Sequence, residues 1–297
     1  MVTIGLAQCA CQSACVLSAL SLKSIRIDTL IGTDTALVRL AQGASPAEVM
    51  LHSPEAGSAG VGDRTLPIGH QYPSCPVVAD DQLDEQPERQ LRSASVAVAV
   101  SGERVLLTRR PASMRSFPRA WVMAGGAVDA TDPTLAHAAV RELKEETGLE
   151  ASPTDLTPFG LWESAFPVTQ AAWRERRLSG SSTRHICITY FLVPVPDANV
   201  PLVLQPEEVD CACWVPITQL LALCDSAGGS DSTGGGDELC FDRAPGSPPG
   251  PPVPASLLAG VYPNVLGEGV GRGHLWALRQ LLDSSPAPAA PAGGRGP

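Results

Sequence analysis

The sequence predicts an α/β (α+β) fold, in which a few helices cover a mixed sheet. Short apolar runs of strand length recur between residues 95 and 215. Two longer stretches, near 134–147 and 274–282, carry apolar residues at helical spacing instead. With 297 residues, 44% of them hydrophobic, the chain is large enough for one sizeable domain with appendages.

The first predicted strands form a hairpin. Val96, Val98 and Val100 alternate with small residues, Ser101-Gly102 turns the chain, and residues 105–108 run apolar again. This alternation is typical of a strand with one apolar face. Further strands are predicted at 121–123, 159–163, 186–193 and 211–215.

A helix is predicted between these strands. Asp132-Pro133 or Thr134 can cap its start, and Gly148 is the residue type expected just past its end. Two more helices are predicted, one at 217–224 and a last, amphipathic one at 274–282.

The remaining segments carry weaker patterns. Residues 1–92 have no assigned fold, although 35–40 and 48–51 could be strands of a small accessory unit. The main domain is expected over 93–284. It contains a Gly-, Ser- and Pro-rich insertion at about 225–254 that is either flexible or a substrate lid. Residues 285–297 form a low-complexity tail.

Composition narrows the possible partners. A net charge of −10 argues against a broad nucleic-acid-binding surface, because such binding depends on Lys and Arg that neutralise phosphates. No run of 18 apolar residues occurs, so no membrane-spanning helix is expected. The nine cysteines include no Cys-x-x-Cys pair, which favours free thiols and an intracellular, cytoplasmic location.

The predicted helix at 134–147 carries a group of acidic residues. Glu142, Glu145 and Glu146 are three and four residues apart, so their carboxylates share one face of the helix. A hard divalent cation would relieve their mutual repulsion, and Mg²⁺ prefers oxygen ligands of this kind. The alternative is a solvated surface helix whose charges pair with one another.

This segment resembles the Nudix box. Gly125-Gly126, Arg141-Glu142, Glu145-Glu146 and Gly148 follow its pattern of Gly, five residues, Glu, seven residues, then Arg-Glu-aliphatic-x-Glu-Glu-x-Gly-aliphatic. The resemblance to Nudix hydrolases implies an α/β/α sandwich with a mixed sheet. It also implies Mg²⁺- or Mn²⁺-dependent hydrolysis of the pyrophosphate in a nucleoside diphosphate that is linked to another group.

The resemblance implies roles for individual residues. Glu142, Glu145 and Glu146 would hold the metal and, with Arg141, form the catalytic set. The backbone carbonyl near Gly126 would add a metal ligand. Arg141 would orient the glutamates through ion pairs, to which its rigid set of donors is suited.

Residues outside the box complete the expected site. Glu208 resembles an extra glutamate that many Nudix enzymes supply from a loop, either as a metal ligand or as the general base, and Glu207 is its rival. Arg109, Arg110 and Arg115 precede the box and could bind substrate phosphates through paired guanidinium hydrogen bonds. A solvated hairpin end is the equal alternative for each arginine.

The box departs from the standard pattern in its spacing. Counted from Gly126, the first glutamate position holds Asp132, and the distance to Arg141 is one residue longer than usual. This spacing is similar to that of the coenzyme A diphosphatases of the superfamily. A second resemblance, over 95–282, is to Nudix proteins associated with hydrolysis of the monomethylated mRNA cap.

Three functions therefore stay open. The first is hydrolysis of a small nucleotide or of a capped RNA 5′ end, and the second is hydrolysis of coenzyme A or an acyl-CoA. The third is a Nudix module that binds a nucleotide without cleaving it, although the intact set of glutamates disfavours this reading.

Overall fold

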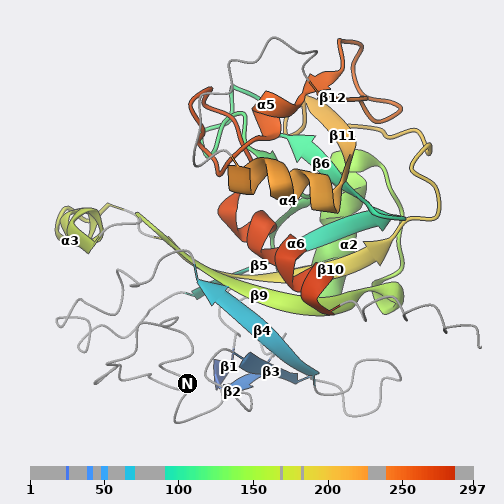
Figure 1. Cartoon of the computed structure of the whole chain (residues 1–297). Helices are drawn as coiled ribbons and strands as arrows, with labels where there is room; N and C mark the ends of the chain where they lie inside the picture. The colour runs from blue at the N-terminus through green and yellow to red at the C-terminus, as the bar shows by residue number, and fades with distance from the viewer. Residues whose placement is uncertain are drawn as a thin grey trace, which may run out of the picture.

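A mixed sheet with helices on both of its faces forms the body of the protein (Figure 1), which confirms the predicted fold class. The computed structural model describes residues 25–26, 39–42, 48–52, 64–70, 91–167, 170–181, 184–226 and 239–284.

The centre of the sheet contains the predicted hairpin. Its strands are β5 (Leu91–Ser101) and β6 (Arg104–Arg109), and Gly102 takes a positive φ of 58° in the turn between them. The predicted later strands are also present, as β9 (Thr157–Phe166), β10 (Arg184–Pro194) and β11 (Cys211–Pro216). β5 runs parallel to β10 and antiparallel to β6, so the sheet is mixed.

The helices divide between the two faces of the sheet. α2 (Leu135–Thr147) packs on one face, and α4 (Ile217–Ser226) and α6 (Arg272–Ser284) pack on the other (Figure 1). β5 separates two hydrophobic clusters through its alternating side chains. Ala97 and Ala99 belong to the cluster on the α2 side, and Val96 and Val98 to the cluster beneath α4 and α6.

The N-terminal part adds strands to one edge of the sheet. These are β1 (Ile25–Arg26), β2 (Arg39–Gln42), β3 (Glu48–His52) and β4 (Arg64–His70). The order across the sheet is β1-β2-β3-β4-β9-β10-β5-β6-β11, and β4 pairs in parallel with β9. Leu66 is buried in the same cluster as α2. The described strands β1 to β4 therefore extend the sheet of the main domain.

Two segments differ from the expected elements. α3 (Gln170–Leu178) lies at the far end of the long β9–β10 arm (Figure 1), and its short and mainly polar sequence was not predicted as a helix. Part of the expected insertion, residues 239–254, contains β12 (Cys240–Phe241) and β13 (Val253–Pro254), which pair with each other.

The segment at 239–254 is attached to the domain by backbone hydrogen bonds and apolar burial. Ala244 donates to the carbonyl of Ala212 in β11 at 2.8 Å, and Phe241 and Val253 are buried. The composition of this segment is typical of a flexible insertion, but these contacts pack it against the domain. The rest of the expected insertion, 227–238, and the tail at 285–297 lie outside the described residues.

The remaining elements are short. They are β7 (Trp121–Val122), β8 (Gly125–Ala127), the 3₁₀ turn η2 (Pro153–Asp155) and α5 (Ala255–Leu258). No helix in the described ranges has the length and apolar character needed to cross a membrane. The five described cysteines are free thiols, namely Cys187, Cys211, Cys213, Cys224 and Cys240.

Candidate active site

The ends of α2 are set by local hydrogen bonds. Of the two predicted caps, Thr134 is the one used, since its hydroxyl oxygen accepts from the backbone N–H of His137 at 3.3 Å. Gly148 ends the helix with a φ of 72°, and its N–H donates to the carbonyl of Lys144 at 2.8 Å. The apolar side of the helix, including Leu143, is buried against the sheet, so the glutamates lie toward β8 and the loop before β11.

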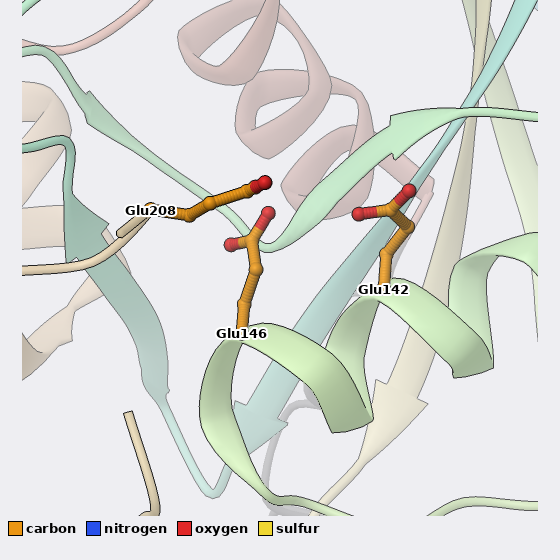
Figure 2. Close-up of side chains that lie close together, drawn as sticks. All are labelled: Glu142, Glu146 and Glu208. Atoms are coloured by element: carbon orange, nitrogen blue, oxygen red, sulfur yellow. The ribbon is translucent and has the colours of Figure 1, made fainter. Parts of the chain in front are cut away.

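Three carboxylates meet beside β8. One oxygen each of Glu142, Glu146 and Glu208 lies within 4.8 Å of the others. Figure 2 shows Glu142 and Glu146 on one face of α2, and Glu208 extending toward Glu146 from the facing loop. Glu146 is only 3% exposed, whereas Glu142 and Glu208 are half-buried. We call these three residues the carboxylate cluster.

The loop that carries Glu208 is anchored to the end of α2. Val203 donates its N–H to the carbonyl of Thr147 at 2.9 Å, and Gln205 donates to the carbonyl of Glu146 at 3.3 Å. Glu208 in turn donates its N–H to Gln205 at 3.0 Å. These bonds hold residues far apart in sequence at a fixed separation, which sequence spacing alone could not predict.

The two glycines of β8 have different roles. A Cβ on Gly125 would lie 2.5 Å from the backbone carbonyl oxygen of Ser95, so this glycine allows the strand to pair closely with β5. A Cβ on Gly126 would instead lie 2.6 Å from Oε1 of Glu142. The N–H of Gly125 donates to Oε1 of Glu146 at 3.3 Å. Both glycines thus border the carboxylate cluster with backbone atoms alone.

Arg141 connects the helix to the loop before it. Its guanidinium donates to both oxygens of Asp132, at 3.1 and 2.9 Å, and to the carbonyl of Ala127 at 3.1 Å. It also donates to Glu142 at 2.9 Å and to Glu145 at 3.0 Å. The hydrogen bonds that Arg141 donates to Asp132 are the largest cause of its raised pKa.

Two acidic residues of the box lie outside the carboxylate cluster. Asp132, at the first glutamate position, is 6% exposed and binds Arg141 and the N–H of Asp129 instead. The side chain of Glu145 is 52% exposed and pairs with Arg141. This geometry does not support the expected ligand role of Glu145. Glu207 is exposed, so of the two rivals it is Glu208 that joins the cluster.

The surroundings of the carboxylate cluster disfavour its negative charges. Burial raises the pKa of Glu146 to about 8; the N–H of Gly125 opposes this shift, and the nearby Glu142 and Glu208 add to it. Burial also raises the pKa of Glu142, against the effect of Arg141. Three carboxylates in such a place need a proton or a cation to balance their charge, and their oxygen atoms suit a hard divalent cation.

The structure separates the three predicted arginines. Arg109 is engaged with acidic groups, at 2.7 Å from Asp210 and 3.5 Å from Glu268, which leaves it poorly placed to bind substrate. Arg110 is half-buried, its Nε donates to the carbonyl of Ser116 at 3.2 Å, and its charge opposes the raised pKa of Glu146. Arg115 is exposed.

Sequence reasoning did not find the acidic partners of Arg109. Glu268 is 3% exposed and accepts a hydrogen bond from Nε1 of Trp121 at 3.0 Å. Asp210 directly precedes β11. Neither residue lies in a local motif. The pairing of β11 with β6 brings Asp210 to Arg109, and the packing of the segment before α6 against β7 brings Glu268 there.

The family model of the NUDIX domain matches residues 90–231, the part of the chain that contains the carboxylate cluster. This match confirms the resemblance to Nudix hydrolases that the box predicted.

The relatives in curated collections share one description, m7GpppN-mRNA hydrolase NUDT17. The protein of Danio rerio is 34% identical over 168 residues, which are 52% of this chain and 53% of that protein. The protein of Xenopus laevis is 36% identical over 157 residues, 49% of this chain and 50% of that protein. The protein of Homo sapiens is 30% identical over 182 residues, 57% of this chain and 53% of that protein. The chain spans about half the length of the curated relatives it matches.

Solved structures also match. The MutT NUDIX hydrolase from Burkholderia pseudomallei is 21% identical, with a TM-score of 0.34, and the match covers 44% of this chain and 86% of that one.

Proposed function

We propose that this protein is a divalent-metal-dependent pyrophosphohydrolase, which cleaves the pyrophosphate of a nucleoside diphosphate linked to another group. The observation that carries the proposal is the convergence of Glu142, Glu146 and Glu208 beside the glycines of β8. A solvated acidic helix, the alternative reading, would leave its glutamates exposed and apart. Here a nearly buried glutamate meets a second one from a distant loop.

The residues present fit a divalent cation. Glu142, Glu146 and Glu208 would hold Mg²⁺ or Mn²⁺, and the backbone near Gly126 is open enough to contribute a carbonyl. When bound, the cation would neutralise charge on the pyrophosphate and activate a water molecule. Glu146 would bind it as a carboxylate, so its raised pKa is a property of the metal-free protein.

The charged residues around the cluster support this chemistry. Arg141 holds the carboxylate of Glu142 at 2.9 Å while Asp132 holds Arg141 from the other side, so one ligand is fixed in direction before any substrate arrives. Arg110 is half-buried and follows Arg109, whose carbonyl accepts the N–H of Asp210 at 3.0 Å, two residues after Glu208; it is therefore the arginine that we expect to pair with a phosphate oxygen.

The substrate we propose is the monomethylated mRNA cap, because the curated relatives described above carry the name of an enzyme that acts on it. The longer box spacing pointed to coenzyme A instead. The structure offers another explanation of that spacing: residues 129–132 form a turn, closed by the N–H of Asp132 on the carbonyl of Asp129 at 3.0 Å, and Asp132 serves Arg141. The longer box therefore does not require a different substrate.

Product analysis tests the proposal. The protein is incubated with Mg²⁺ or Mn²⁺ and either a monomethylated cap dinucleotide or coenzyme A, and the products are separated by chromatography. We expect 7-methyl-GDP or 7-methyl-GMP from the cap, and no product from the Glu146→Gln variant. Release of phosphopantetheine and adenosine bisphosphate from coenzyme A would instead favour coenzyme A over the cap as the substrate.

Failure to cleave any of a wide panel of nucleotides would contradict the enzymatic proposal. In that case, nucleotide-dependent stabilisation in a thermal shift assay would favour a binding module.

A further inference from the structure

Two aromatic side chains from distant segments meet at the end of the loop before β7. The rings of Phe117 and Tyr262 form a T-shaped pair, with 5.9 Å between their centroids and 71° between their planes. The hydroxyl of Tyr262 donates to the carbonyl of Pro118 at 3.0 Å, which ties the two segments together. Phe117 is nevertheless 54% exposed, so the contact leaves much of its ring open to solvent.

The backbone holds Phe117 in this exposed position. Phe117 has a φ of 52° and Arg119 a φ of 62°, values that bulky residues rarely adopt. Such a conformation persists only where the surrounding contacts impose it. Two backbone hydrogen bonds do so here, from Arg119 to the carbonyl of Arg110 and from Arg110 to the carbonyl of Ala120, each at 3.0 Å.

Arg110 links this aromatic pair to the carboxylate cluster. Its Nε donates to the carbonyl of Ser116, the residue before Phe117, at 3.2 Å. The neighbouring Arg109 accepts the N–H of Asp210 at its backbone carbonyl at 3.0 Å, two residues after Glu208. Hydrogen bonds at Arg109 and Arg110 therefore connect the loop that carries Glu208 with the segment that carries Phe117.

We propose that Phe117, backed by Tyr262, stacks on the nucleobase of the substrate. This inference rests on the proposed function, since a pyrophosphate bound at the carboxylate cluster defines where the base can reach. A stacking surface needs a ring that is held in place and exposed to solvent, and Phe117 has both properties. A ring present only for packing would gain little from a position that leaves half of it in water.

Binding of two ligands that resist hydrolysis tests the inference. They are α,β-methylene-GDP, which has a base, and methylenediphosphonate, which has none. Affinities are measured by calorimetry with Mg²⁺ in excess, for the wild type, Phe117→Ala and Phe117→Trp. Phe166→Ala is the matched control, because Phe166 is also an exposed phenylalanine, 43% exposed, but lies on the β9–β10 arm.

We expect Phe117→Ala to weaken binding of α,β-methylene-GDP by about fivefold to a hundredfold, the range for loss of one base-stacking side chain. Binding of methylenediphosphonate should stay unchanged, Phe117→Trp should bind like the wild type, and Phe166→Ala should have no effect. An unchanged affinity of Phe117→Ala for α,β-methylene-GDP would overturn the inference, and so would equal weakening of both ligands. Failure of the wild type to bind either ligand would instead count against the proposed function itself.

Discussion

Replacement of Gly126 by alanine should damage the site and spare the fold. The new methyl carbon would lie 2.6 Å from Oε1 of Glu142, and the other two close atoms also belong to that carboxylate. To restore an ordinary van der Waals separation, the carboxylate must move by about 0.8 Å or more. Metal–ligand distances tolerate only about 0.2 Å, so this shift removes Glu142 from a productive position.

The expected loss is about tenfold to a hundredfold in Mn²⁺ affinity and in turnover, the usual effect of disturbing one ligand's position. The melting temperature should change little, because the displaced group is the end of a flexible side chain. Gly125→Ala is the matched control. Its methyl group would lie 2.5 Å from a backbone oxygen of β5, so it should lower the melting temperature clearly. Full activity of Gly126→Ala, or a loss of stability equal to that of Gly125→Ala, would refute the reasoning.

Two further predictions concern residues around the site. Asp132→Asn removes the charge that holds Arg141, so turnover should fall about tenfold to a hundredfold. Lys144→Gln, which breaks an exposed ion pair, is the control and should leave turnover unchanged. Equal rates for the two variants would contradict the role of Asp132. Burial, and to a lesser degree Arg110, lowers the pKa of His274 to about 4. Because the unfolded chain takes up this proton near pH 6.5, His274 should lower the free energy of unfolding by about 2 kcal/mol from pH 8 to pH 5, against the opposite contribution of Glu146. The change in the free energy of unfolding between these pH values, measured by urea unfolding, should therefore differ between the wild type and His274→Gln by about this amount, and identical changes would exclude the assignment.

Local chemistry made α2 and the central hairpin predictable. The cap at Thr134 and the left-handed Gly148 depend only on neighbouring residues, and helical spacing alone places Glu142 and Glu146 on one face. The same reasoning could not predict which glutamate would pair with Arg141 and lie outside the carboxylate cluster. Glu145 is that glutamate, since it accepts a hydrogen bond from the guanidinium of Arg141. This pairing depends on Asp132 in the preceding turn, which fixes the position of the guanidinium.

Contacts between distant segments account for what the sequence did not predict. Glu208 reaches the cluster because Gln205 bonds to the last turn of α2, and Arg109 is engaged because Glu268 arrives from the segment before α6. Residues 239–254 have the composition of a flexible insertion, yet Phe241 is buried on the domain. In each case the deciding partner lies far along the chain, where no spacing rule applies.

Titration of Mn²⁺ into the wild type and single Glu→Gln variants tests the central claim most directly, because it measures the carboxylate cluster without any choice of substrate. Glu146→Gln and Glu208→Gln should each weaken Mn²⁺ binding by about tenfold or more. Glu207→Gln, an exposed neighbour of Glu208, should bind like the wild type. Wild-type affinity in Glu208→Gln, or equal losses in Glu207→Gln and Glu208→Gln, would contradict the assignment of Glu142, Glu146 and Glu208 as a metal site.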